Sequence, residues 1–165
     1  MIKKSLIFTK KFVIHAFLKE NSINYQVNTK GVLGMIVRNY AGGVVFSEDK
    51  VLLFKNENDK WMLPREKLSE GELSNEVALN KIQKESGVSA QIISTVGHTN
   101  YDYYAVSRQK PFCNKITWYI MKSQNEKDNE KCTSFFKIDE AMKLIDENQE
   151  KSLINLSFKK YKELE

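Results

Sequence analysis

Three charged side chains stand at helical spacing in the middle of the chain. Lys81, Lys84 and Glu85 are related as i, i+3 and i+4, so they share one face if residues 74–86 form a helix. Two ammonium groups on one face can bind a phosphate directly, and Arg65 could act as a third cation. The alternative is a solvated ion pair between Lys81 and Glu85, worth about 0.3–0.5 kcal/mol. Both interpretations stay open on the residues alone.

A helix, several strands and two closing helices must position these charges. The helix is predicted over residues 74–86, because apolar residues recur on one face and Gly87 is a typical C-terminal stop. Before it, residues 41–46 and 51–54 read as two buried strands joined by a polar turn. Further strands are predicted at about 90–97, 101–106 and 116–121, and further helices at 139–147 and 151–164.

Several motifs along residues 35–154 resemble those of the Nudix hydrolases. They are the strand pair, the sequence Trp61-x-Leu63-Pro64, and the loop and helix that end in Glu85-Ser86-Gly87-Val88. The family motif, laid on residues 66–88, reads Gly, five residues, Glu, seven residues, Arg-Glu, an apolar residue, any residue, Glu-Glu, any residue, Gly and an apolar residue. The positions that match it are Glu72, Ile82, Glu85, Gly87 and Val88.

The resemblance implies a fold and an activity. The implied fold is a Nudix-type α/β/α sandwich with a mixed β-sheet, built by residues 35–165 and preceded by a basic N-terminal extension, residues 1–34. The implied activity is hydrolysis of phosphoanhydride bonds in nucleoside diphosphate derivatives. In that family a carboxylate cluster on the helix holds Mg²⁺ or Mn²⁺, which neutralises the diphosphate and orients a water molecule.

Four motif positions depart from the family. Glu66 replaces the first Gly, Asn80 replaces the Arg, and Lys81 and Lys84 replace two glutamates. The helix face therefore changes by about four charge units, which repels a divalent cation. Glu85 remains as a metal candidate and, with Glu72, as a catalytic candidate. We expect weak or absent metal-dependent hydrolysis, with Mg²⁺ or Mn²⁺ if the site is active and none otherwise.

Other acidic residues could complete a metal site. Glu66 could swing toward the metal position, although acids in such a loop are usually solvated. Glu126 and Glu130 are candidates from a later loop. The alternative function is a non-catalytic nucleotide-binding sensor or regulatory module, in which Lys81 and Lys84 hold phosphate without a metal.

A stretch rich in tyrosine indicates the substrate class. Residues 97–111 and 115–121 resemble Nudix members that hydrolyse dinucleoside polyphosphates, which implies that Tyr103 stacks on a base and Arg108 meets phosphate. Strand alternation places Tyr101 and Tyr103 on one face. Packing of these rings into the core is the alternative.

The charge distribution limits the choice of partners. The chain has 165 residues and a formal charge of +5, and residues 1–34 account for all of it with six lysines against Glu20. The main domain is neutral, so its sequence makes no strong case for nucleic acid. Residues 6–18 could lie on an anionic membrane surface or simply pack as a helix.

The two cysteines predict no metal site and no disulfide framework. Cys113 and Cys132 stand in no metal-binding spacing, which suits a reducing cytoplasm. Cys113 is expected to be exposed, in a basic loop that holds Arg108, Lys110 and Lys115.

Overall fold

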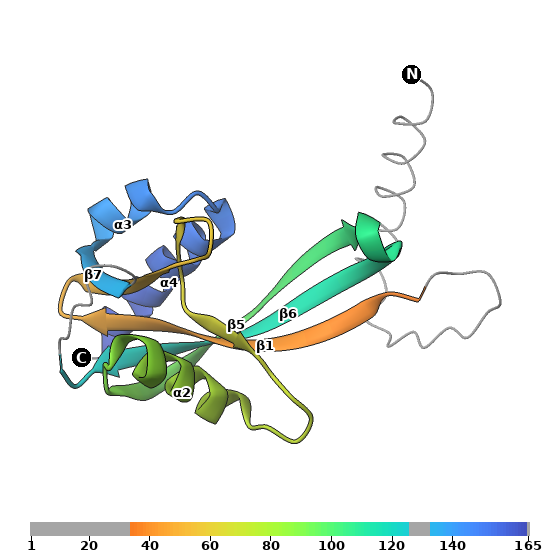
Figure 1. Cartoon of the computed structure of the whole chain (residues 1–165). Coiled ribbons are helices and arrows are strands. Elements are labelled where there is room, and N and C mark those ends of the chain that lie inside the picture. The colour runs from red at the N-terminus through yellow and green to blue at the C-terminus, as the bar shows by residue number, and fades with distance from the viewer. Residues whose placement is uncertain (1–33, 126–132, 165) are drawn as a thin grey trace. The chain divides into compact units, whose positions relative to one another are not determined.

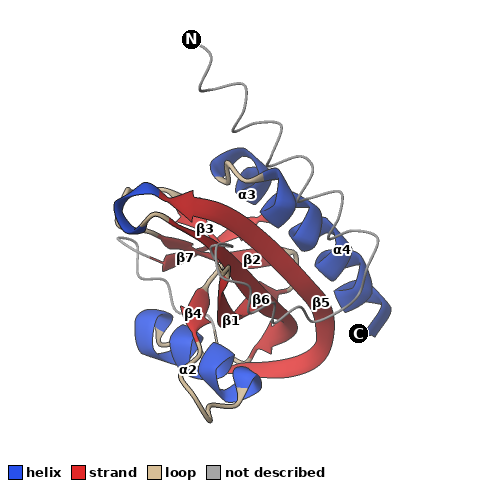
Figure 2. Cartoon of the chain, turned by 90° about the vertical axis from the view of Figure 1, so that its right-hand side faces the viewer, coloured by secondary structure: helices blue, strands red, loops and turns tan. Residues whose placement is uncertain are grey.

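The computed structural model describes residues 34–125 and 133–164, which form a mixed sheet with helices on both faces (Figures 1 and 2). The predicted basic extension and the acids Glu126 and Glu130 lie outside the described residues, so those expectations stay predictions. The strands of this part are β1 (Ile36–Ser47), β2 (Lys50–Lys55), β3 (Trp61–Met62), β4 (Arg65–Lys67), β5 (Ala90–Ala105), β6 (Lys110–Ser123) and β7 (Thr133–Lys137). The helices are α2 (Ser74–Ser86), α3 (Ile138–Leu144) and α4 (Asn148–Leu164), and a 3₁₀ turn, η1 (Val106–Arg108), joins β5 to β6.

β1 and β6 form the centre of the sheet. The strand order is β3-β2-β1-β6-β5, with β4 beside β1 and β7 beside β2. β1 runs parallel to β6 from Ile36 opposite Phe112 to Phe46 opposite Lys122, and the other pairings are antiparallel. The predicted mixed sheet is confirmed.

Each face of the sheet has its own core. Residues 41–46 of β1 are all buried, and strand alternation sends their side chains to opposite faces. Val44 packs with residues of α3 and α4, whereas Val45 packs with residues of α2. Figure 2 shows α2 on one side of the strands and α4 on the other. The predicted α/β/α layering is therefore confirmed.

α2 has the boundaries that the sequence predicts. Its apolar residues Val77, Ala78 and Ile82 are buried against the sheet. Gly87 ends it in the left-handed region, with φ 69°, and donates its N–H to the carbonyl of Gln83. The helix therefore turns its charged face away from the core.

Several predicted boundaries were wrong. The strands predicted at 90–97 and 101–106 are one strand, β5, with bulges between Ile92 and Ser94 and between Thr95 and Gly97. The closing helices span 138–144 and 148–164, and β7 was not predicted. Among the described residues, no helix combines the length and the apolar character that crossing a bilayer requires.

The expectation of an exposed Cys113 was also wrong. Cys113 lies in β6, between β1 and β5, and its side chain is buried. Burial, with a hydrogen bond that the thiol donates to the Asp102 carboxylate, raises the pKa of the Cys113 thiol to about 11. The thiol is therefore protonated at neutral pH and is a poor nucleophile.

β1, β5 and β6 extend together beyond the helices (Figure 1). We call this projection the arm, and it comprises residues 34–40 and 98–116, including the turn at η1. No described helix covers its far end in the figure. Lys110 and Lys115, predicted in a loop, lie in the β6 strand of the arm.

Candidate functional site

One lysine of α2 is held between two carboxylates. The ammonium of Lys81 lies 3.0 Å from Oε2 of Glu66 in β4 and 2.5 Å from Oε1 of Glu85, one helical turn further along α2. The side chain of Lys81 is 19% exposed, against 50% for Glu66 and 45% for Glu85. The ammonium of Lys81 is therefore less exposed than its two partners and links β4 to α2. We call Glu66, Lys81 and Glu85 the Lys81 cluster.

The pKa values of this cluster reflect the shared charge. Partial burial opposes the charge of Lys81, but its hydrogen bonds to Glu85 and Glu66 outweigh that effect and raise its pKa. Partial burial would likewise raise the pKa of Glu66, but the hydrogen bond from Lys81 and the charges of Lys81 and Lys84 hold it below the usual value. Lys81 and Glu66 are therefore both charged near neutral pH.

The donor set does not fit a divalent cation. Glu85, the predicted metal ligand, accepts the ammonium of Lys81. Glu72 accepts the Ser69 N–H at 2.6 Å and so braces its own loop. Within residues 34–125 and 133–164, no three acidic, histidine or cysteine side chains gather in a way that could hold a metal ion. Mg²⁺ or Mn²⁺ would have to displace an ammonium that is already bound by both carboxylates.

Arg65 is tied to a buried carboxylate that the sequence analysis missed. Its Nη1 lies 2.5 Å from Oε1 of Glu150 in α4, and Oε2 of Glu150 accepts the Leu63 N–H at 2.8 Å. Only 7% of the Glu150 side chain is exposed. The signal was present, because Glu150 lies at helical spacing from the buried residues Leu153 and Ile154.

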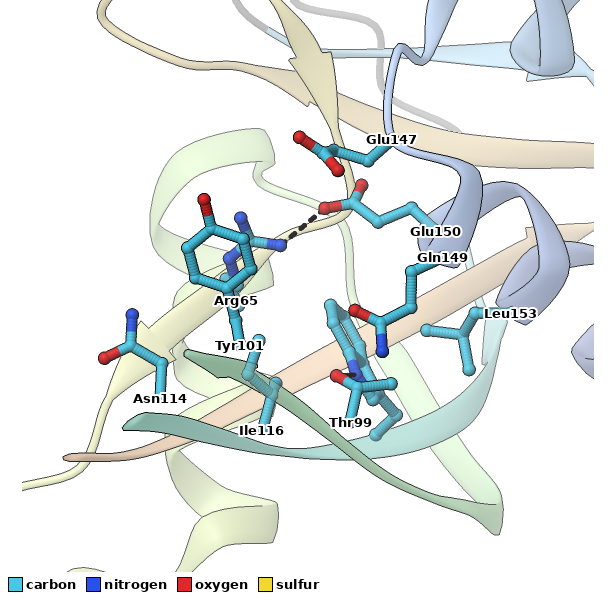
Figure 3. Close-up of a pocket in the computed structure, with 10 residues that line it drawn as sticks. Arg65, Thr99, Tyr101, Asn114, Ile116, Glu147, Gln149, Glu150 and Leu153 are labelled. Atoms are coloured by element: carbon cyan, nitrogen blue, oxygen red, sulfur yellow. Dashed lines mark hydrogen bonds and ion pairs between the residues drawn. The ribbon is translucent and has the colours of Figure 1, made fainter. Parts of the chain in front are cut away.

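Arg65 is a common wall of two cavities. The larger, of about 380 Å³, lies beside Lys81 and Glu85 and is bounded by residues 54–58. The smaller, of about 200 Å³, lies between β5, β6 and the start of α4 (Figure 3). A ligand with two parts could therefore occupy both cavities across Arg65.

The smaller cavity combines aromatic and polar side chains. Trp118 and the half-exposed Tyr101 line it, and the indole N–H of Trp118 donates to Oγ1 of Thr99 at 2.8 Å. Oδ1 of Asn114 is buried there and accepts no hydrogen bond from the described residues. The cavity thus offers a flat apolar wall and a free hydrogen-bond acceptor, which suits a planar polar ring.

Two predicted binding residues lie elsewhere. The Tyr103 ring stacks on Phe112, with ring centroids 5.4 Å apart, and its hydroxyl accepts a hydrogen bond from Arg38. Arg108 lies in η1, at the turn of the arm. Neither residue lines either cavity, whereas Tyr101 lines the smaller one. Lys84 is exposed beside the Lys81 cluster, as predicted for its helix face.

Solved structures with similar folds were found. The chain resembles an Ap4A hydrolase from C. elegans with a TM-score of 0.56 and 19% identity, over 76% of this chain and 98% of that one. It resembles a Nudix hydrolase from Nitrosomonas europaea with a TM-score of 0.58 and 16% identity, over 87% and 78% of the two chains. It also resembles an ADP-ribose pyrophosphatase from Streptococcus suis with a TM-score of 0.56 and 15% identity, over 75% of this chain and 91% of that one. No protein-family model and no curated protein sequence matches the chain.

The Lys81 cluster gives a prediction about stability and pH. Replacing Lys81 by glutamine is expected to lower the free energy of unfolding by about 1 kcal/mol near pH 7, because two half-exposed carboxylates lose their shared cation. Because folding lowers the pKa of Glu66, its ionised carboxylate stabilises the folded state above the ordinary pKa of 4.5. This stabilisation is lost as the pH falls through the folded-state pKa. Because folding raises the pKa of Lys81, its ammonium stabilises the folded state below the ordinary pKa of 10.5. This stabilisation is lost as the pH rises through the folded-state pKa.

Urea denaturation across pH should therefore show the widest gap between the wild type and Lys81→Gln on the plateau between those limits. Lys84→Gln removes an equal charge from the same helix face but leaves both hydrogen bonds of Lys81, so it serves as the matched control and should show a smaller gap. A gap that stays constant down to pH 2 would contradict the ion-pair interpretation.

The Glu150 contacts give a second prediction. Glu150→Ala is expected to lower the free energy of unfolding by about 2–4 kcal/mol, because Arg65 and the Leu63 N–H both lose a buried partner. Asp146→Asn breaks the exposed Lys60–Asp146 pair nearby and should leave the urea midpoint almost unchanged. Equal effects of the two substitutions would show that Glu150 is not a structural anchor.

Proposed function

Since the chain has the Nudix fold, we propose that it binds a nucleoside diphosphate derivative across the two cavities beside Arg65, without a divalent cation and with little or no hydrolysis. One observation carries this proposal: the ammonium of Lys81 stands between Glu66 and Glu85 and forms an ion pair with each carboxylate. The same cluster would otherwise repel a phosphate group. The ammonium of Lys81 reduces that repulsion, and Lys84 on the same helix face brings the formal charge of the four side chains to zero.

The cavity at Lys81 suits phosphate groups. An ammonium has three N–H donors, and the two carboxylates use two of them, so one remains for a phosphate oxygen. The exposed Lys84 adds a second positive charge on the same helix face. Arg65 lines this cavity too, with Glu150 fixing its position. These groups can bind a diphosphate but supply no Lewis acid to activate water.

The smaller cavity suits the base. Trp118 and Tyr101 provide aromatic surface, and the free Oδ1 of Asn114 can accept a hydrogen bond from an amino group. Relatives in fold act on compounds of this class, since their names include Ap4A hydrolase and ADP-ribose pyrophosphatase. Such ligands and a free, buried Cys113 suit the cytoplasm, which we propose as the location.

The second candidate function is slow phosphoanhydride hydrolysis of the same ligands, with Mg²⁺ or Mn²⁺ held by Glu85 and neighbouring acids. The names of the structural neighbours favour it. The Lys81 cluster counts against it, since a divalent cation at Glu85 would be repelled by the ammonium that Oε1 of Glu85 already binds.

Calorimetry with ADP and with a dinucleoside tetraphosphate separates the two candidates. We expect the affinity of the full chain to be the same in Mg²⁺ and in excess chelator, with no product released in either. Lys84→Gln should weaken binding about threefold to tenfold without changing the melting temperature, because a positive charge beside the cavity at Lys81 is lost. Lys143→Gln, which removes an exposed lysine of α3 rather than of the α2 face that carries Lys81, is the matched control. Turnover that chelator abolishes would contradict the proposal and support the hydrolase.

Rebuilding the carboxylate cluster should create metal dependence. In a variant with Asn80→Arg, Lys81→Glu and Lys84→Glu, the helix face regains three carboxylates, so nucleotide binding is expected to become at least tenfold tighter in Mg²⁺ than in chelator. Mg²⁺ titration by calorimetry without nucleotide should then show a binding site that the wild type lacks. A variant that folds but ignores Mg²⁺ would show that Lys81 and Lys84 are not what keeps the cation out.

A further inference from the structure

The arm carries a row of aromatic and cationic side chains on one face. Tyr101 and Tyr103 of β5 have ring centroids 5.8 Å apart, and the Tyr103 ring lies parallel to that of Phe112 in β6. The Arg38 guanidinium of β1 stands 4.2 Å above the Phe112 ring and donates to the Tyr103 hydroxyl. These four residues form one ordered stack, which we call the aromatic platform.

The platform presents aromatic surface at its Tyr101 end. Phe112 is buried and forms its base, whereas Tyr101 is 53% exposed. The rings are fixed by three paired strands, and no described helix covers the far end of the arm (Figure 1). Rigid, exposed rings on a sheet offer a stacking surface at little entropic cost. Only Tyr101 of the platform also lines a cavity.

Positive charge gathers on the arm, although the domain as a whole is neutral. The arm holds four basic residues against one acidic residue, a formal charge of +3, so the rest of residues 35–165 carries about −3. Residues 1–34, with a formal charge of +5, directly precede its first strand in the sequence. The charged residues of the arm are Arg38, Arg108, Lys110, Lys115 and Asp102.

We propose that the arm binds single-stranded nucleic acid, with a base stacked on the platform at Tyr101 and backbone phosphates bound by Arg108 and Lys110. Any base can stack on an aromatic ring. The cations can form ion pairs with the backbone, which carries one phosphate per nucleotide. The phosphate contacts lie outside the nucleotide site, because Arg108 and Lys110 line neither cavity, whereas Tyr101 is shared with the smaller cavity.

Charge favours nucleic acid over a second copy of the chain. A two-fold dimer through the platform would bring two arms of +3 against each other, and like charges at close range destabilise an interface. A polyanion instead gains from every cation of the arm. The separation of charge within a neutral domain therefore supports an anionic partner with flat rings.

The test measures binding of the full chain to a fluorescein-labelled oligouridylate of about 12 nucleotides by anisotropy. Tyr101→Ala should weaken binding about tenfold, since one base loses its stacking partner. Tyr104→Ala is the matched control, because Tyr104 is 52% exposed on the opposite face of the same strand, and it should change binding less than twofold. Melting temperatures establish that both variants fold.

The phosphate contacts are tested by a double variant at the turn of the arm. Arg108→Gln with Lys110→Gln should reduce the slope of log affinity against log salt by about 1.4, at about 0.7 for each lost phosphate contact. Its affinity for ADP should not change. This variant separates the arm from the nucleotide site, which would survive if the arm proposal failed.

Several results would overturn the proposal. They are no binding of the oligonucleotide at low salt, equal losses in Tyr101→Ala and Tyr104→Ala, or equally tight binding of heparin that Tyr101→Ala leaves intact. A dimer seen by light scattering and dissolved by Tyr101→Ala would assign the platform to a second copy. Binding to anionic phospholipid vesicles that requires Tyr101, without binding to the oligonucleotide, would assign it to a membrane surface.

Discussion

The buried carboxylate of Glu150 joins two distant parts of the chain and thereby shapes the site. It accepts hydrogen bonds from Arg65 and from the Leu63 N–H, so the segment between β3 and β4 is fixed against the first turn of α4. Both cavities use Arg65 as a wall, and the position of that wall depends on this one side chain. Burial removes the Glu150 carboxylate from water, and the hydrogen bonds to both of its oxygens offset that cost of desolvation.

The Lys81 cluster shows how a fold can keep the frame of a metal site after the metal ligands change. Two carboxylates that face each other across β4 and α2 need a positive charge between them. Because the ammonium belongs to the chain, it supplies that charge without the entropy loss of binding a free ion from solution. It offers one charge and three donors instead of two charges and several coordination positions, so it can hold an anion but cannot polarise a bound water molecule as strongly.

Local patterns predicted the parts of the structure that depend on local physics. The 74–86 helix, its stop at Gly87 and the Lys81–Glu85 pair follow from spacing along one helix. Glu66 and Glu150 were not predicted as partners because their contacts join β4 to α2 and to α4, and no periodicity encodes such distances. The continuity of β5 was missed for a similar reason, since bulges are set by the neighbouring strand β6. The burial of Cys113 likewise follows from strand pairing.

The parallel pairing of β1 with β6 has a consequence for synthesis. A ribosome that adds about 5–20 residues per second completes β6 several seconds after β1. During that time β1 lacks its parallel partner strand β6. Its hairpin with β2 can form early, but residues 41–46 supply side chains to both cores, and neither core can close until β6 arrives. The two layers should therefore fold together, late and in one step, and a chain interrupted before residue 123 would expose both apolar faces at once.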